Sequence, residues 1–281
     1  MSIFAYDRGM GSLDRFLDEQ LARGRGYFSR DEGLGAIGLS AGAFAAAATR
    51  LVKKRRLVNV RHGFYLILRP EDRAAGAPDP ARWIDPLMKY QGIDYRISLL
   101  PAAAFHGSSH QASMVFQVIV PKQLRSFDIG RHRLQFIYQG PDAFAEVNVP
   151  QWLGQLKTEA GFAKVAGVEL TLLDCARYFH KSAGINGVAQ IVKDLGANAD
   201  PHKLAEAGAH YENSAVRRLG YLLELEGHER QASVLKPFVK RAKSMKPLDP
   251  SVRALSDSLN ALHEKNSEWR LLINTTVEID S

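Results

Sequence analysis

The sequence predicts an α+β protein in which a small amino-terminal domain precedes a larger mixed domain. The segment from Ser29 to Leu68 has two helical patterns, followed by two short apolar runs that a glycine-containing turn joins. Farther along, the apolar runs 114–120 and 134–138 indicate strands, and most of the chain after residue 138 has helical periodicity. Helix, turn, helix and hairpin in this order predict a winged helix-turn-helix over residues 1–75.

Each element of this small domain has a local signal. Ser29 and Glu32 form a capping box, which satisfies free amides at a helix start. Gly38 can take the positive φ of the turn after that helix, and Ser40 can cap the next helix. Before them, apolar residues at helical spacing predict an amphipathic first helix, namely Leu13, Phe16, Leu17 and Leu21.

The second helix of the pair has a face of small side chains opposite its apolar face. Small residues let a helix sit deep in the major groove of DNA, so this face is the expected reader of base edges. It comprises Ser40, Gly42, Ala46 and Thr49.

A basic run follows this helix, and from Arg50 to Arg69 the sequence contains no Asp or Glu. Cations of this kind neutralise phosphates and release counterions, which supplies most of the sequence-independent affinity for DNA. The alternative is that the run only solvates the helix end and offsets its dipole. The expected phosphate contacts are Arg50, Lys53, Lys54, Arg55 and Arg56, and the wing residues expected at the minor groove are Arg61 and His62.

Composition is that of a globular protein: 281 residues, 46% hydrophobic and 24% charged, with a net charge of +7 that favours an acidic partner. The segment 71–80, rich in proline, glycine and alanine, indicates a linker between domains 1–75 and 80–281. No apolar run approaches the roughly 20 residues of a membrane span. The single cysteine, Cys175, lies in an apolar stretch and indicates a core residue in a reducing cytoplasm, where a DNA-binding protein would be nucleoid-associated.

The residues that could suggest catalysis lack the neighbours that a catalytic site needs. His106 and His110 have no Cys, Asp or Glu in their loop to complete a metal site. The carboxylate pairs Asp142 with Glu146 and Glu169 with Asp174 lack the lysine two residues later that restriction-type nucleases use. We therefore expect no enzyme activity, no metal and no cofactor. The alternatives are a nuclease or other enzyme that its winged helix targets to DNA, and a winged helix that only docks a protein.

A second basic cluster lies near the carboxyl end, in a stretch without acidic residues. It is either a solvated surface, a second phosphate-contacting surface, or a docking site for an acidic partner protein. Its members are Lys236, Lys240, Arg241, Lys243 and Lys246.

Several short sequence fragments, in the same order along the chain as in the family, resemble the AbiEi antitoxins. These are the repressor half of AbiE-type (type IV) toxin–antitoxin and abortive-infection systems. The wing HGFYLIL at 62–68 is similar to the family's wing. In the larger domain Leu170 departs from the pattern, because the family usually has arginine there. The other matching fragments are 97–100, 104–107, 115–121, 129–130, 134–136, 169 with 171–174, 218–224 and 269–274.

The resemblance implies a transcriptional autorepressor that binds inverted repeats in double-stranded DNA of its own promoter. It also implies an antitoxin that counters a nucleotidyltransferase-like toxin in phage defence. In the family the winged helix binds DNA and the larger domain, here 80–281, is the antitoxin domain. Several relatives counter the toxin without a stable complex, so direct contact with the toxin stays open.

Overall fold

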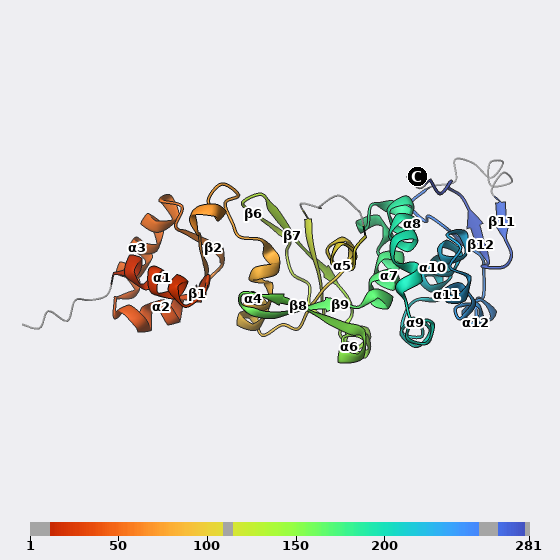
Figure 1. Cartoon of the computed structure of the whole chain (residues 1–281), viewed down its shortest axis with the longest axis horizontal. Coiled ribbons are helices and arrows are strands. Elements are labelled where there is room, and N and C mark those ends of the chain that lie inside the picture. Colours follow the sequence, from red (N-terminus) through yellow and green to blue (C-terminus); the bar gives the residue numbers. More distant parts are fainter. Residues whose placement is uncertain (1–11, 109–114, 253–263, 279–281) are drawn as a thin grey trace, which may run out of the picture. The chain divides into compact units, whose positions relative to one another are not determined.

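The computed structural model describes residues 12–108, 115–252 and 264–278 (Figure 1). Helices and sheets are both present, which confirms the α+β class predicted from the sequence. Contacts along the backbone divide the chain into two compact units. Unit 1 is the chain up to Asp94 with Ser126–Leu134 and Leu156–Ala163, and unit 2 is the remainder.

Unit 1 combines helices with a three-stranded antiparallel sheet of order β1-β3-β2. Tyr65 of the middle strand lies opposite Phe28 on one side and Asn59 on the other. The elements are α1 (Leu13–Ala22), β1 (Tyr27–Ser29), α2 (Arg30–Ile37), α3 (Ala41–Lys53), β2 (Leu57–Arg61), β3 (Phe64–Ile67), η1 (Pro70–Asp72), η2 (Pro80–Arg82) and α4 (Ile84–Gln91).

The local signals in the sequence set the ends of α2 and α3. The Ser29 amide donates to Glu32 Oε2 at 2.7 Å and the Glu32 amide donates to Ser29 Oγ at 3.2 Å, so the capping box is confirmed. Gly38 ends α2 with a φ of 63°, and Ser40 caps α3 by accepting from the Ala43 amide. The chain turns through 111° between the two helices.

One apolar core joins α1, α2 and α3 to the sheet. Phe28 packs edge-on against Phe16 at 5.2 Å between ring centroids and stacks on Tyr65 at 5.4 Å. Gly33 lets α2 approach the core closely, because a Cβ there would lie 2.7 Å from the ring of Phe44. The face of α3 expected to be buried is buried, with Phe44, Ala48 and Leu51 at its centre.

The segment 71–80 is not the open linker that its composition suggests. It contains the end of η1 and the start of η2, and Asp72, Ala77 and Pro80 are buried. Its backbone is also fixed, since the Arg131 amide donates to the Ala75 carbonyl at 2.8 Å. Composition did not predict this, because alanine and proline occur in packed segments as well as in open linkers. The compact unit also continues to Asp94.

The larger sheet has six strands in the order β6-β7-β5-β4-β9-β8. β4 pairs antiparallel with β5 and parallel with β9, in which Ile97 lies opposite Val165. The sequence indicated β5 and β7 but missed β4, β6, β8 and β9. The strands are β4 (Arg96–Ile97), β5 (Val115–Val120), β6 (Phe127–Ile129), β7 (His132–Tyr138), β8 (Leu153–Thr158) and β9 (Gly161–Ala166).

Helices make up most of unit 2 after β9, as their periodicity predicted. Among the described residues no single helix is long and apolar enough to cross a membrane, and α2 with α3 meets that test only as a bent pair. The helices of unit 2 are α5 (Leu99–Phe105), α6 (Pro141–Val147), η3 (Pro150–Trp152), α7 (Val168–Arg177), η4 (Phe179–Lys181), α8 (Gly184–Leu195), η5 (Gly196–Asn198), α9 (Pro201–Gly208), α10 (Asn213–Leu225), α11 (Glu229–Ser233) and α12 (Lys236–Lys240).

A small sheet of order β10-β12-β11 ends the described chain. Its strands are β10 (Lys246–Pro247), β11 (Glu264–Asn266) and β12 (Leu271–Ile273). The apolar pattern from Leu271 to Ile279 predicts a longer strand, but the strand ends at Ile273. The helical spacing of Val252, Leu255, Leu259 and Leu262 predicts an amphipathic helix, but apart from Val252 these residues lie outside the described ones.

Candidate nucleic-acid interface

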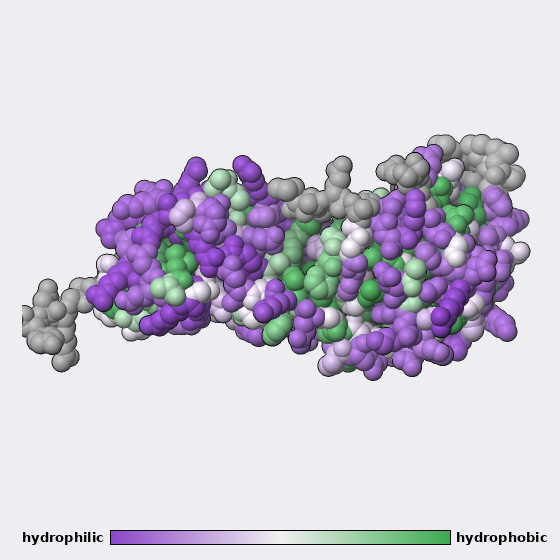
Figure 2. Space-filling view, in the orientation of Figure 1, coloured by the Kyte–Doolittle hydropathy of each residue, from purple (hydrophilic) through white to green (hydrophobic). Residues whose placement is uncertain are grey.

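The face of α3 that the sequence assigned to base reading is on the surface. Ser40, Gly42, Ala46 and Thr49 are all solvent-accessible, opposite the buried Phe44. Thr49 Oγ1 donates to the Ala45 carbonyl at 2.9 Å, which holds the hydroxyl close to its own helix. The helix therefore offers a low surface of small side chains. Figure 2 shows hydrophilic residues covering much of the visible face of α1 to α3.

Four cations gather where α3 ends, and they are exposed: Arg50, Lys53, Lys54 and Arg55. Within the described part of the chain, no carboxylate forms an ion pair with any of them. The start of α3 carries no acidic residue either. The carboxyl end of this helix thus combines solvent-facing charge with a small-residue face that runs beside it.

Arg56 differs from its four neighbours. Its guanidinium pairs with Asp14 Oδ1 at 2.7 Å and also with Asp18, both on α1. These contacts join the start of β2 to the first helix. The expected phosphate contact at Arg56 is therefore already occupied by carboxylates of the same unit.

At the turn of the β2–β3 hairpin, His62 is exposed and Arg61 is half-buried. The Arg61 guanidinium lies 4.5 Å from the ring centroid of Phe127, so it faces the protein rather than solvent. Tyr90 Oη donates to the His62 carbonyl at 3.1 Å, and a Cβ on Gly63 would lie 2.5 Å from that hydroxyl oxygen. Of the two expected wing contacts, only His62 is presented outward.

The second basic cluster also combines an ion-paired cation with exposed ones. Lys236 Nζ pairs with Glu224 Oε2 at 2.6 Å and with Glu268, and it lies 4.3 Å from the ring centroid of Trp269. Burial alone would lower the pKa of Lys236, but the hydrogen bonds to these carboxylates outweigh it and raise that pKa. The spacing of Lys236, Lys240 and Lys243 predicts that they share one helical face, but this is wrong, because α12 ends at Lys240. The members of the cluster that remain accessible to solvent are Lys240, Arg241, Lys243 and Lys246.

Three of the groups considered for catalysis, Glu169, His106 and Glu146, have structural partners. Glu169 Oε1 accepts the Asp200 amide at 2.7 Å, and His106 Nε2 lies 2.7 Å from the Ala166 carbonyl oxygen. Glu146 lies 3.2 Å from His210 Nδ1. In the described ranges there is no group of three His, Cys, Asp or Glu residues that could hold a metal ion, and His110 lies outside those ranges.

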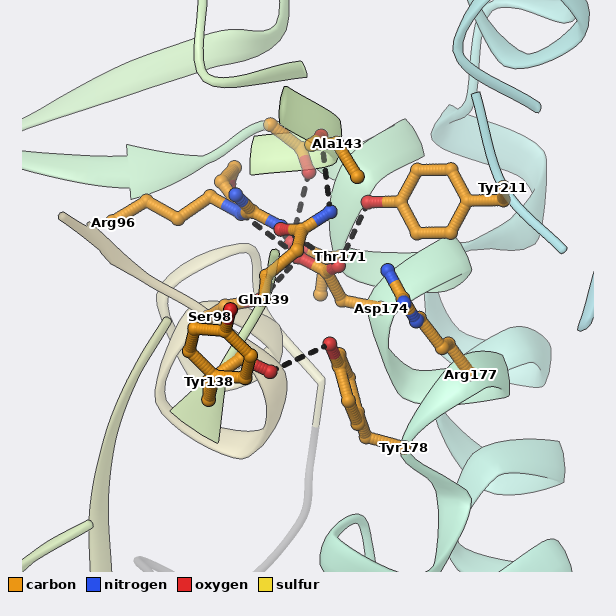
Figure 3. Close-up of polar contacts among 12 residues, drawn as sticks. Arg96, Ser98, Tyr138, Gln139, Ala143, Thr171, Asp174, Arg177, Tyr178 and Tyr211 are labelled. Carbon is orange, nitrogen blue, oxygen red and sulfur yellow. Dashed lines mark hydrogen bonds and ion pairs between the residues drawn. The ribbon is translucent and has the colours of Figure 1, made fainter. Parts of the chain in front are cut away.

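Asp174 belongs to a buried polar cluster that sequence reasoning missed (Figure 3). Arg96 on β4 donates to it from Nε at 3.0 Å and from Nη2 at 2.9 Å, and both side chains are fully buried. Ser98 Oγ and Tyr211 Oη each donate to the same carboxylate at 2.7 Å. Arg96 Nη2 also donates to Gln139 Oε1 at 2.8 Å. The sequence offered only an arginine beside an apolar stretch and an aspartate in an apolar helix, which is too general a pattern to pair them.

This cluster fastens the sheet of unit 2 to its helices. Burial and the Asp174 carboxylate together raise the pKa of the Tyr211 hydroxyl, so it stays a proton donor. For the Arg96 guanidinium, burial alone would lower the pKa, but Asp174 raises it. The stability of this buried ion pair depends on all of these hydrogen bonds, because a buried charge without a compensating partner is energetically costly.

The comparisons with known proteins agree with the resemblance seen in the sequence. The family model of the AbiEi antitoxin C-terminal domain matches residues 96–225. Residues 96–225 belong to the AbiEi antitoxin family. The match to this domain supports an antitoxin role in a toxin–antitoxin system.

A solved structure shares the fold over nearly the whole chain. The crystal structure of the RV2827C protein from Mycobacterium tuberculosis superposes with a TM-score of 0.64 at 16% identity, covering 95% of this chain and 92% of that chain. No curated protein matches the sequence.

The matched range contains the whole Arg96–Asp174 cluster. Leu170, which departs from the family pattern, is fully buried in α7 and joins the core of the AbiEi domain. Beyond the match, Trp269 packs on Gly220 of α10, and its Nε1 donates to Glu224 at 3.1 Å. Two of the fragments that carried the resemblance, 218–224 and 269–274, thus meet in space.

Proposed function

We propose that this protein is a DNA-binding autorepressor and antitoxin, in which unit 1 binds inverted repeats in the promoter of its own operon. The AbiEi domain counters the toxin of the same operon, which by the family resemblance is nucleotidyltransferase-like. With these roles the protein acts at the nucleoid in the cytoplasm.

The arrangement of α2, α3 and the β2–β3 hairpin supports a winged helix-turn-helix. Helices at about 90–120° joined by a turn of three or four residues are typical of DNA-binding helix-turn-helix motifs. Here the chain turns through 111° across Gly38, Leu39 and Ser40. In such motifs the second helix enters the major groove, and in this chain that helix is α3.

The observation that carries the proposal is the row of exposed cations at the end of α3. Arg50, Lys53 and Lys54 have no ion-pair partner among the described residues, whereas Arg56 beside them has two. Cations without ion-pair partners, beside a helix that can enter the major groove, can contact the phosphates on either side of that groove. The small face of α3, with Ser40 and Thr49 as its polar groups, would then lie against base edges, and His62 would reach the minor groove.

Binding of the full chain to a fragment of its own promoter, followed by fluorescence anisotropy over a range of salt concentrations, tests this proposal. A Lys53→Gln/Lys54→Gln variant should reduce the log–log salt slope by about two units, since each lost phosphate contact removes about 0.9. The control is Lys203→Gln/Arg230→Gln, which removes the same charge from exposed sites of unit 2. Equal affinity for the promoter and for a scrambled fragment contradicts sequence-specific repression.

A further inference from the structure

Unit 1 contains an open groove of about 410 Å³ beside the carboxyl end of α3. Its charged lining consists of Arg55, Arg73 and Arg131, and no Asp or Glu lines it. We call it the arginine groove. Its apolar wall includes Val52 of α3, so it begins where the exposed cations of that helix end.

The three guanidinium groups have no side-chain hydrogen bond or ion pair within the described ranges. Arg73 Nε is buried without any hydrogen-bond partner there. Other arginines of unit 1 are neutralised, since Arg69 and Arg82 both pair with Glu159. Several cationic side chains that line one groove without a counter-charge among the lining residues favour binding of an anion.

Three separate segments build the groove. Arg55 has a φ of 51°, and its amide and that of Arg56 close the end of α3 by donating to the Val52 and Leu51 carbonyls. Glycine is the usual residue at such a left-handed helix end, yet the chain keeps an arginine there. The unusual choice keeps a long cationic side chain at the mouth of the groove.

The other two arginines are held together by a close backbone approach. The turn between β6 and β7 lies on the 75–76 segment, where the Arg131 amide donates to the Ala75 carbonyl at 2.8 Å. A Cβ on Gly130 would lie 2.1 Å from that carbonyl oxygen, so only glycine fits. The backbone of Arg131 is thereby held against the segment that carries Arg73, and both residues line the groove.

We propose that the arginine groove binds the DNA phosphodiester backbone and extends the contact of α3 beyond the winged helix-turn-helix. This inference rests on the proposed DNA binding of unit 1, and it adds Arg73 and Arg131, which lie outside the basic run of residues 50–69. Guanidinium forks bind phosphate oxygens in pairs, and the groove is open to solvent, so a phosphate backbone can approach it from outside.

The test uses the full chain and the promoter fragment, with salt titrations of the wild type and of Arg73→Gln/Arg131→Gln. The salt slope of the variant should fall by about two units, and its affinity at 0.1 M salt should fall roughly tenfold for each lost contact. Arg73→Lys/Arg131→Lys keeps both charges and should restore the slope. Lys203→Gln/Arg230→Gln controls for net charge, and thermal unfolding checks that each variant is folded.

Two results would overturn the inference, and they are distinguishable. If the wild type binds the promoter and the glutamine variant keeps the full slope, the groove makes no phosphate contact while the proposed function stands. If the wild type binds no DNA, the proposed function fails and the groove's role fails with it.

Discussion

Replacing Asp174 by asparagine removes one charge from the buried cluster at nearly constant shape. Asp174 accepts from Arg96 twice, from Ser98 and from Tyr211, and all of these groups are donors. The amide nitrogen that Asp174→Asn introduces is itself a donor and cannot accept from them. At least one donor therefore loses its partner, and the Arg96 charge is left buried without a counter-charge.

The magnitude follows from the burial of the pair. Both side chains have no exposed surface, and removing one partner of such a pair costs about 3–5 kcal/mol. Since each 1.4 kcal/mol is about a factor of ten, the equilibrium for opening unit 2 should rise by about two to nearly four orders of magnitude. Replacing both partners, as Arg96→Met/Asp174→Leu, should cost less than the single change, because no charge is then left unpaired.

Cys175 supplies the assay. It is the single cysteine of the chain, it is fully buried beside Asp174 in α7, and burial raises the pKa of its thiol to about 12. A thiol reagent therefore reaches it only when unit 2 opens, and its labelling rate under native conditions measures that opening. Asp142→Asn, which removes an exposed carboxylate at the start of α6, is the control. Labelling of the Asp174→Asn variant at the wild-type rate would refute the reasoning.

Local geometry gives three further predictions. Arg55→Gly should leave the free energy of unfolding unchanged or raise it by up to about 1 kcal/mol, because glycine adopts the left-handed φ without strain. The same change should weaken DNA binding. If stability and DNA affinity fell together, Arg55 would only support the fold. Gly220→Ala should lower the free energy of unfolding by about 1–3 kcal/mol, since its Cβ would lie 2.1 Å from the Trp269 ring, and unchanged stability and tryptophan fluorescence would contradict that contact. Burial alone would raise the pKa of Glu32, but hydrogen bonds from Ser29 and Arg25 lower it below its ordinary value of 4.5. The ionised carboxylate therefore stabilises unit 1 above about pH 4.5 and loses that effect as the pH falls. Glu32→Gln should be less stable than the wild type by a few tenths of a kcal/mol at pH 7 and equally stable at pH 3 in urea titrations, and a difference that persists at pH 3 would exclude this cause.

The features that could be predicted from the sequence are those that neighbouring residues determine. The capping box at Ser29, the glycine turn at Gly38 and the cap at Ser40 each involve side chains within three or four positions. The exposed face of α3 follows from helical periodicity alone. The same local logic predicted Cys175 as a core residue, and it is fully buried.

Features that depend on distant partners were not predictable. Arg56 is adjacent to Arg55 in sequence, yet only the fold brings Asp14 and Asp18 to it. The apolar side chain of Phe105 would be placed in the core from the sequence, yet this last residue of α5 is 44% exposed. Asp174, the partner of Arg96, lies 78 residues away in the sequence. Strand β4 and the arginine groove likewise depend on several separate segments, so no single stretch of sequence predicts them.

The central claim is that repression and antitoxin activity are two separable functions of one chain. The most direct measurement supplies the full-length Lys53→Gln/Lys54→Gln variant to cells that carry a reporter behind the operon's own promoter and the toxin behind an independent inducible promoter. We expect that, at wild-type protein levels, the variant loses repression of the reporter and still protects the cells from the toxin. Retained repression, or loss of protection together with repression, would contradict the claim.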